Sequence, residues 1–114
     1  MKVDLGRLKS IILCGAIGDQ YGDPFEMMTC QMIQEKFSRE IKSYVITDKV
    51  ADKPYTYSDD TQMTIAVINS IIESKGSITE DLILSSFVKN FEPSRGYCRK
   101  IYDLLLDGIE GKLE

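Results

Sequence analysis

The apolar residues of this chain recur at helical spacing in five separate segments. Spacings of three and four residues place side chains on one face of a helix, whereas a half-buried strand needs strict alternation. The spacing predicts helices over residues 3–21, 26–37, 59–75, 79–90 and 96–108. Residues 41–57 contain some β-branched residues, but a lone short strand would lack a partner, so we expect an extended connector there. The sequence therefore predicts an all-α fold, a compact multi-helix bundle.

Local signals indicate where some of these helices begin and end. Gly76 is expected at the C′ position of the third helix, because glycine readily adopts the left-handed conformation found there, and Lys75 complements the helix terminus. Thr79 is expected to cap the fourth helix, and Pro93 to stop the chain from continuing it.

Composition limits the class of protein. A chain of 114 residues has room for a single domain, residues 1–114, that buries roughly two-thirds of its unfolded surface. The net charge of −4 argues against nucleic-acid partners and anionic membranes, and no apolar run approaches transmembrane length. Three widely spaced cysteines and the lack of a recognisable signal peptide predict reduced thiols and a cytoplasmic location.

The sequence contains no histidine, which restricts the chemistry that the chain can perform by itself. Catalysis by Ser-His-Asp or Cys-His groups is excluded within the chain. Any general acid or base must be a carboxylate, a tyrosine, a lysine or a metal-bound water.

Two carboxylates and two hydroxyls stand in a row shortly before the apolar run 63–68, from which Gln62 separates them: Ser58, Asp59, Asp60 and Thr61. Such oxygen ligands are the ones that Mg²⁺ and Mn²⁺ prefer. The same residue types are also common at the start of a helix, where serine caps and aspartate faces the unpaired N–H groups. From residue type alone, a metal site and an ordinary helix cap both remain open.

Residues 15–26 contain three glycines and three acidic residues, directly after the apolar stretch 11–14. Each glycine costs a helix about 1 kcal/mol relative to alanine, so their presence needs a reason. Gly15, Gly18 and Gly22 are three and four residues apart and share a helical face, which another backbone or a ligand could approach closely. The alternative is a glycine-notched core helix that ends in a turn at Pro24.

Together these segments resemble the ADP-ribosylglycohydrolase family, the relatives of dinitrogenase-reductase-activating glycohydrolase. Residues 18–26 read GDQYGDPFE and fit the family pattern G-D-x-x-G-x-x-x-E, and residues 58–63 read SDDTQM and fit [T/S]-D-D-T-x-M. Residues 95–97 read RGY and are similar to the family's R-G-Y-G stretch, with Cys98 in place of the second glycine. The resemblance runs from Leu8 to Leu106 and covers the N-terminal part of the family's sequence.

The resemblance implies a role for each matching residue. Ser58, Asp59 and Asp60 match ligands of a pair of Mg²⁺ or Mn²⁺ ions. Glu26 matches the catalytic acidic residue that positions or activates the attacking water. Substrate binding is implied for Gly18, Asp19, Gly22, Arg95, Gly96 and Tyr97. The side chain of Cys98 puts a close approach of backbone to phosphate in doubt at that point.

The reaction that the resemblance implies is hydrolysis of the bond between ribose C1″ of ADP-ribose and a protein side chain such as arginine, or of a related ADP-ribosyl bond. The family completes its metal site with a C-terminal D-x-D-[T/S] group. The aspartates after Asp60 are Asp81, Asp103 and Asp107, and no two of them have that spacing. We therefore expect half of a dinuclear site, which should bind a divalent ion weakly because Mg²⁺ requires near-octahedral oxygen coordination.

Two functions remain open from the sequence. The first is an ADP-ribosyl hydrolase that acts on an ADP-ribosylated protein or an ADP-ribose-containing small molecule. Its missing ligands would then come from a complementary chain or from a second copy in a homo-oligomer. The second is a non-catalytic binding or regulatory module that keeps the N-terminal fold and associates with itself or with a protein partner. Substitution of Asp59 and Asp60 should abolish the first activity but need not abolish the second.

Overall fold

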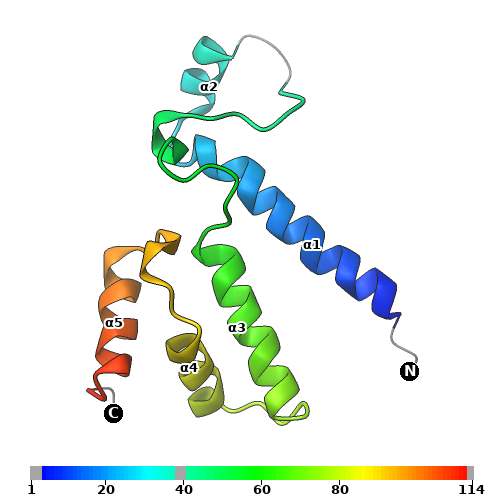
Figure 1. Cartoon of the computed structure of the whole chain (residues 1–114), viewed down its shortest axis with the longest axis vertical. Coiled ribbons are helices and arrows are strands. Elements are labelled where there is room, and N and C mark those ends of the chain that lie inside the picture. Colours follow the sequence, from blue (N-terminus) through cyan, green and yellow to red (C-terminus); the bar gives the residue numbers. More distant parts are fainter. Residues whose placement is uncertain (1–3, 38–40, 113–114) are drawn as a thin grey trace. The chain divides into compact units, whose positions relative to one another are not determined.

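The computed structural model describes residues 4–37 and 41–112, and over these residues the chain is all-α, which confirms the predicted fold class (Figure 1). The helices are α1 (Leu5–Gly22), α2 (Cys30–Lys36), α3 (Asp59–Glu73), α4 (Glu80–Lys89) and α5 (Arg99–Ile109). Three short 3-10 helices connect them: η1 (Asp23–Phe25), η2 (Asp48–Val50) and η3 (Pro93–Arg95). Within the described ranges, no helix is long and apolar enough to cross a membrane.

The contacts divide the chain after Tyr57 into two compact units. Unit 1 comprises residues 1–57 and contains α1, η1, α2 and η2, whereas unit 2 comprises residues 58–114 and contains α3, α4, η3 and α5. Each unit is described by itself below. That residues 1–114 act as a single domain stays a prediction.

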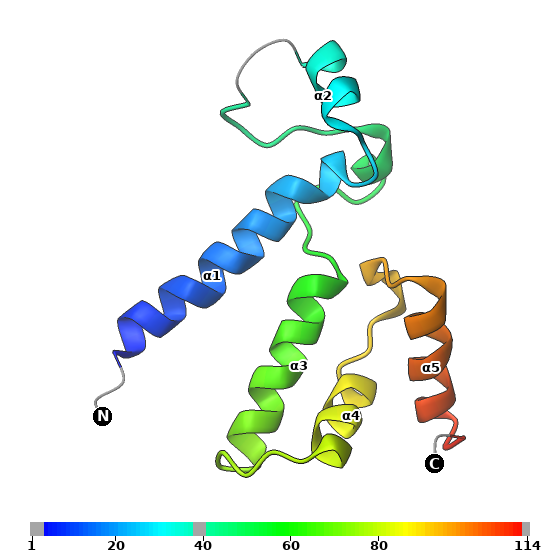
Figure 2. The same ribbon diagram turned by 180° about the vertical axis from the view of Figure 1, so that it is seen from behind.

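In unit 1, the end of α1 leads into η1, and the connector brings η2 against η1 (Figure 2). Pro24 in η1 and Val50 in η2 are buried. The Thr47 hydroxyl donates a hydrogen bond of 2.6 Å to the Pro24 carbonyl and so ties the connector to η1. The rings of Phe25 and Phe37 pack edge to face with centroids 5.5 Å apart. The small core of this unit therefore lies around η1, beside the predicted catalytic residue.

In unit 2, α3 and α4 form an antiparallel hairpin, and α5 packs against α4. Small residues allow α3 and α4 to approach closely: Ala66, Ser70 and Ser86 are all buried. The Ser86 hydroxyl donates to the Ala66 carbonyl at 2.6 Å, so the hairpin is joined by a buried polar bond as well as by packing. Leu105 of α5 is buried in the same unit.

The first three helices differ from their predicted bounds. The predicted start of the first helix at Val3 lies outside the described residues. The second helix begins at Cys30 and not at residue 26, because Thr29 caps it by accepting a 3.1 Å hydrogen bond from the Met32 amide. Met27, predicted on that helix, precedes it at a φ of +67° and is 92% exposed. The third helix ends at Glu73, earlier than the predicted residue 75.

The C-terminal end of α3 corrects one residue assignment. The C-cap is Ser74, so Lys75, with a φ of +52°, occupies the C′ position that was predicted for Gly76. Gly76 follows at a φ of +88°. Both residues are left-handed, which is why α3 stops there.

The last two helices show which local sequence signals were sufficient to predict where a helix begins. Thr79 caps α4 as predicted, accepting a 3.2 Å hydrogen bond from the Leu82 amide. The last helix begins at Arg99 and not at Gly96, because Gly96 has a φ of +90°, which a right-handed helix cannot include. The connector 41–57 is largely without helix or strand as predicted, except for η2.

Candidate functional site

Ser58 caps the N-terminus of α3. It is buried, and its hydroxyl accepts a 3.3 Å hydrogen bond from the Asp60 amide. Asp59 and Asp60 occupy the first turn, where their negative charges face the unpaired N–H groups of the helix. The capping interpretation of this segment is therefore correct, and a metal-binding role would come in addition to it.

The two aspartates have different surroundings. Asp59 is half-buried, whereas Asp60 is exposed. Thr64 anchors the backbone here, since its hydroxyl donates a 2.7 Å hydrogen bond to the Asp60 carbonyl. Asp60 is thus the more accessible of the two aspartates, whereas Asp59 is partly covered.

Tyr97 lies close enough to Asp59 for the carboxylate charge to act on its hydroxyl. Burial is the main reason why the pKa of Tyr97 lies above its ordinary value of 10.0. A hydrogen bond with the Glu92 backbone opposes this effect, and the negative charge of Asp59 raises the pKa further. The Tyr97 ring also packs on Phe91, with centroids 5.1 Å apart. Two motifs that are separated in sequence therefore lie within electrostatic range of each other.

Arg95 belongs to η3 and is mostly buried. Its Nε donates a 2.7 Å hydrogen bond to Oε2 of Glu92, and 15% of its side chain is exposed. Gly96 follows in the left-handed conformation, with a φ of +90°, and Tyr97 is the next residue. Cys98 is the exposed N-cap residue of α5. The segment 95–97 is thus a tight turn between η3 and α5, held by the Arg95–Glu92 ion pair.

Glu26 lies in unit 1, immediately after η1, and its side chain is 57% exposed. Lys49 of η2 forms ion pairs with both acids of this turn: its Nζ lies 2.8 Å from Oε2 of Glu26 and also contacts Asp23. Burial lowers the pKa of Lys49, but the hydrogen bonds and charges of Asp23 and Glu26 outweigh burial. The net result is a pKa above the ordinary value of 10.5. The charged form of Lys49 is therefore the one that this site favours.

Gly18, Asp19 and Gly22 form the end of α1, before Glu26. Both glycines are exposed and Asp19 is half-buried. A Cβ atom built on Gly18 or Gly22 would meet nothing within 4 Å. Packing within unit 1 therefore does not require glycine at these two positions.

The predicted site residues fall into two groups. Unit 2 holds the proposed metal ligands together with the turn of residues 95–97. Unit 1 holds Glu26 and the last turn of α1. Within unit 2, the Asp59–Tyr97 interaction is the observation that unites the two motifs.

The ligand types of this site suit a hard divalent cation, but there are too few ligands to complete its coordination shell. Ser58, Asp59 and Asp60 supply hydroxyl and carboxylate oxygens, the ligands that Mg²⁺ and Mn²⁺ prefer. Across residues 4–37 and 41–112, however, no group of three acidic or thiol side chains gathers closely enough to hold a metal ion. The residues present would provide only one side of a coordination shell.

The sequence motifs did not identify two residues that form polar contacts in or beside the predicted site, Lys49 and Gln62. Lys49, which pairs with Glu26, lies in a connector without a periodic pattern. Gln62 is buried in α3, and its Nε2 donates a 2.6 Å hydrogen bond to the Asn90 carbonyl at the end of α4. Its Oε1 is buried without a hydrogen-bond partner. A polar residue on the buried face of an apolar helix was the one available signal for Gln62.

Comparison with protein-family models identifies a family for this chain. The model of the family described as ADP-ribosylglycohydrolase matches residues 2–110 of the 114-residue chain. Searches of curated proteins and of solved structures gave no match.

Proposed function

The chain belongs to the ADP-ribosylglycohydrolase family, and from this premise we propose that it takes part in metal-dependent hydrolysis of an ADP-ribosyl–protein bond or a related ADP-ribosyl bond. The observation that supports the proposal is the electrostatic influence of Asp59 on Tyr97 within unit 2. It joins the segment of proposed metal ligands to the segment that matches the family's R-G-Y stretch.

Ser58, Asp59 and Asp60 would hold Mg²⁺ or Mn²⁺, with further ligands from outside these 114 residues. When bound, such ions orient ribose hydroxyls and lower the pKa of a bound water. The position of the three residues at a helix N-terminus supports this role in part, because the carboxylates are held in place by the first turn of α3. Since the Ser58 hydroxyl already serves as the cap, the two carboxylates carry most of the proposed affinity.

Tyr97 and Arg95 would contact the ADP-ribosyl group. The tyrosine hydroxyl keeps its proton at neutral pH, so it is available to donate a hydrogen bond to a ribose or phosphate oxygen. The guanidinium of Arg95 is directed by Glu92 and suits a phosphate, for which arginine offers a forked set of donors. Gly96 between them leaves the backbone of the turn accessible.

Glu26 would act as the base that positions the attacking water. Its exposed carboxylate can accept a proton from water. Lys49 keeps this carboxylate in one orientation, although the positive charge also competes with water for the same oxygens. In a glycosidic reaction with an oxocarbenium-like transition state, a nearby carboxylate stabilises the developing positive charge.

The deciding experiment combines calorimetric titration of Mg²⁺ and Mn²⁺ with hydrolysis of ADP-ribosyl-arginine. We expect weak metal binding in the unmodified chain and its loss in Asp59→Ala/Asp60→Ala. Asp60 and Asp81 provide a matched pair, because each is the second residue of a helix. Asp60→Asn should therefore weaken metal binding, whereas Asp81→Asn should leave it unchanged.

The outcomes separate the two candidate functions. Metal-dependent hydrolysis that is lost in Asp60→Asn supports the hydrolase. Binding of ADP-ribose without turnover, insensitive to metal, would instead support the non-catalytic binding module. Absence of metal binding and of ADP-ribose binding would contradict the proposed function.

A further inference from the structure

The buried side chain of Gln62 joins two helices of unit 2, although one of its atoms has no partner. The residue belongs to α3, and its Nε2 donates a 2.6 Å hydrogen bond to the backbone carbonyl of Asn90, the C-cap residue of α4. Because that carbonyl can only accept, the nitrogen of the amide must face it. Oε1 then lies on the other side of the amide, where no described residue donates a hydrogen bond to it.

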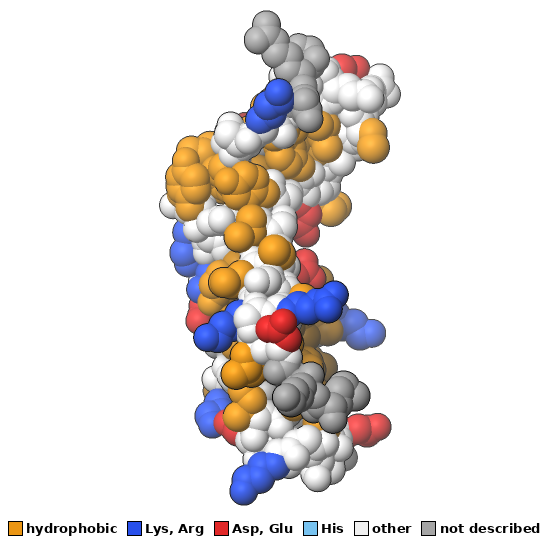
Figure 3. Space-filling view, turned by 90° about the vertical axis from the view of Figure 1, so that its right-hand side faces the viewer, with side chains coloured by type: hydrophobic (Ala, Val, Ile, Leu, Met, Phe, Trp, Pro, Cys, Tyr) orange, Lys and Arg blue, Asp and Glu red, His pale blue; other side chains and the backbone are white. Residues whose placement is uncertain are grey.

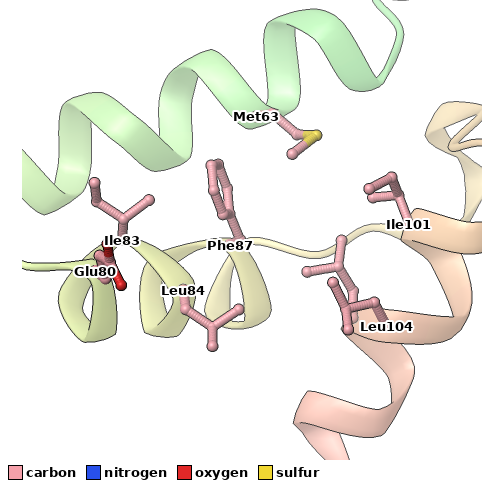
Figure 4. A pocket seen from close by; sticks show the side chains of 8 residues that line it. Met63, Glu80, Ile83, Leu84, Phe87, Ile101 and Leu104 are labelled. Carbon is pink, nitrogen blue, oxygen red and sulfur yellow. The ribbon is translucent and has the colours of Figure 1, made fainter. Parts of the chain in front are cut away.

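Stability alone does not explain a glutamine at this position. One hydrogen bond makes a modest net contribution to stability, and a buried acceptor without a partner typically costs at least as much. An apolar side chain would avoid this cost, and apolar side chains do fill neighbouring space in this unit. Figure 4 shows two of them, Met63 of α3 and Phe87 of α4, in a pocket that both helices line. The bond between Gln62 and Asn90 therefore needs a reason other than stability.

The backbone of Gln62 is fixed to the segment of proposed metal ligands. Its amide donates a 3.2 Å hydrogen bond to the Ser58 carbonyl and so closes the first turn of α3. Asp59 and Asp60 lie in that turn. Gln62 is thus bonded to the metal-ligand segment through its backbone and to the end of α4 through its side chain.

Asn90 is also held by its own amide and side chain. The backbone amide and Nδ2 both donate to the Ser86 carbonyl, at 3.0 and 2.7 Å, and Oδ1 accepts a 3.1 Å hydrogen bond from Asn69 of α3. An ion pair between Lys89 and Glu73 joins the same helices, but both side chains are more than half exposed, so water screens it. Figure 3 shows charged side chains projecting from the surface of the molecule. The bonds of Asn90 are the better-defined link between α3 and the end of α4.

Phe91, the next residue, connects Asn90 to the substrate turn, which we define as residues 95–97. The Phe91 ring packs against Tyr97 of this turn, with centroids 5.1 Å apart. It also packs edge to face against Tyr102 of α5, with centroids 5.3 Å apart. A change in the direction of the Asn90 carbonyl would therefore move Phe91, and the substrate turn with it.

We propose that Gln62 is a positioning residue of the proposed ADP-ribosyl site. Its bond to the Asn90 carbonyl fixes where the substrate turn lies relative to the proposed metal ligands. Gln62 acts through the backbone of residues 90–97 and not by contact with the ligand. Its effect on the turn follows from contacts within unit 2 alone, whereas its effect on ADP-ribose binding also rests on the proposed function.

Hydrogen exchange of the full chain tests the effect on the turn. In Gln62→Met the freed Asn90 carbonyl turns toward water and loosens the residues that follow it. The Arg95 amide donates a 3.1 Å hydrogen bond to the Glu92 carbonyl and should exchange more than about fivefold faster in this variant. The Ile83 amide, in the first turn of α4, should keep its rate. The midpoint of thermal unfolding should change little, because removal of the unpaired Oε1 offsets the lost bond.

Ser86→Ala is the matched control, because it removes a different buried hydrogen bond between α3 and α4. It should lower the midpoint of thermal unfolding, but it should accelerate exchange at Arg95 no more than at Ile83, since the bond from Gln62 remains. Gln62→Leu, which also lacks the donor, repeats the test if the methionine variant fails to fold.

Calorimetric titration with ADP-ribose extends the test to the ligand. If the unmodified chain binds ADP-ribose, Gln62→Met should raise the dissociation constant at least about fivefold, because the binding groups are misplaced. Ser86→Ala should leave it unchanged below its unfolding temperature. If the unmodified chain does not bind ADP-ribose, the proposed function fails, and hydrogen exchange still decides whether Gln62 positions the turn.

Three results would overturn the proposal. Unchanged exchange of the Arg95 amide in Gln62→Met would show that the bond to Asn90 does not hold the turn. Equal acceleration at Arg95 and Ile83, with a lower midpoint of unfolding, would show that Gln62 only stabilises the hairpin of α3 and α4. Faster exchange at Arg95 with an unchanged affinity for ADP-ribose would show that the position of the turn does not matter to the site.

Discussion

Lys49 holds the carboxylate of Glu26 in an ion pair, with 2.8 Å between Nζ and Oε2, although the two residues belong to different segments of unit 1. The same ammonium group contacts Asp23, at the start of the η1 turn. The orientation of the predicted catalytic carboxylate therefore depends on a connector residue that is not part of any motif.

Replacing Lys49 should change how the stability of the protein depends on pH. The pKa of Lys49 in the folded state is raised, so the folded state binds this proton more tightly than the unfolded state does. The resulting stabilisation is complete below the ordinary pKa of 10.5 and is lost as the pH rises through the folded-state pKa. Its size should stay below about 1 kcal/mol, because 39% of the side chain is exposed and the pair is screened by solvent.

Urea unfolding at about pH 8 and about pH 11 measures this effect as a difference between the two conditions. The difference should be smaller in Lys49→Met than in the unmodified chain. Lys36→Met, at an exposed lysine near the end of α2, serves as the control and should retain the full difference. Identical pH dependence in Lys49→Met and in the unmodified chain would contradict the ion pair.

Neutralising Asp59 should lower the pKa of Tyr97. Burial keeps that pKa above 10.0, and the negative charge of Asp59 contributes to the increase, so Asp59→Asn should remove part of it. Asp60→Asn is the control, because Asp60 is exposed and its charge is not among the causes of the increase. The tyrosinate absorbance, taken as the difference from a Tyr97→Phe background, reports the titration. Equal effects of the two aspartate substitutions would argue against a specific influence of the Asp59 charge on Tyr97.

Substitutions of Ser58 should separate its capping role from metal binding. Ser58→Ala should cost about 1 kcal/mol in the free energy of unfolding, whereas Ser58→Gly should cost only a few tenths, because glycine is tolerated as an N-cap. Both variants remove the hydroxyl, so a loss of Mg²⁺ affinity in Ser58→Gly would identify that hydroxyl as a ligand. Thermal unfolding and calorimetry measure the two effects separately. A glycine variant as unstable as the alanine variant would contradict the capping interpretation.

The buried bond between α3 and α4 should contribute measurably to stability. Ser86→Ala removes the 2.6 Å hydrogen bond to the Ala66 carbonyl and should destabilise the protein by about 1 kcal/mol. Ser85→Ala, one residue earlier and exposed, should change stability by less than about 0.5 kcal/mol. Denaturant unfolding of the two variants provides the comparison. If both behave alike, the Ser86 hydroxyl does not stabilise the hairpin.

Helix prediction succeeded where a local signal decided the structure. Thr79 was expected to cap α4 because its hydroxyl has only to reach an amide three residues away, and it does. The start of α2 was missed because Thr29 competes with Glu26 as the point of initiation, and apolar spacing alone does not distinguish them. Lys75 was missed at the C′ position because glycine was preferred there on intrinsic grounds, yet both residues adopt the left-handed conformation.

The sequence by itself determined the all-α class, the family and the residues that its motifs carry, because periodicity, capping and motif matches depend on neighbours along the chain. Only the tertiary structure decided that Tyr97 lies near Asp59 and that Lys49 pairs with Glu26. It also decided that the Ser86 hydroxyl of α4 donates a hydrogen bond to the Ala66 carbonyl of α3. These contacts join residues far apart in sequence, and they depend on the path of the chain through η1, η2 and η3, which no local pattern specifies.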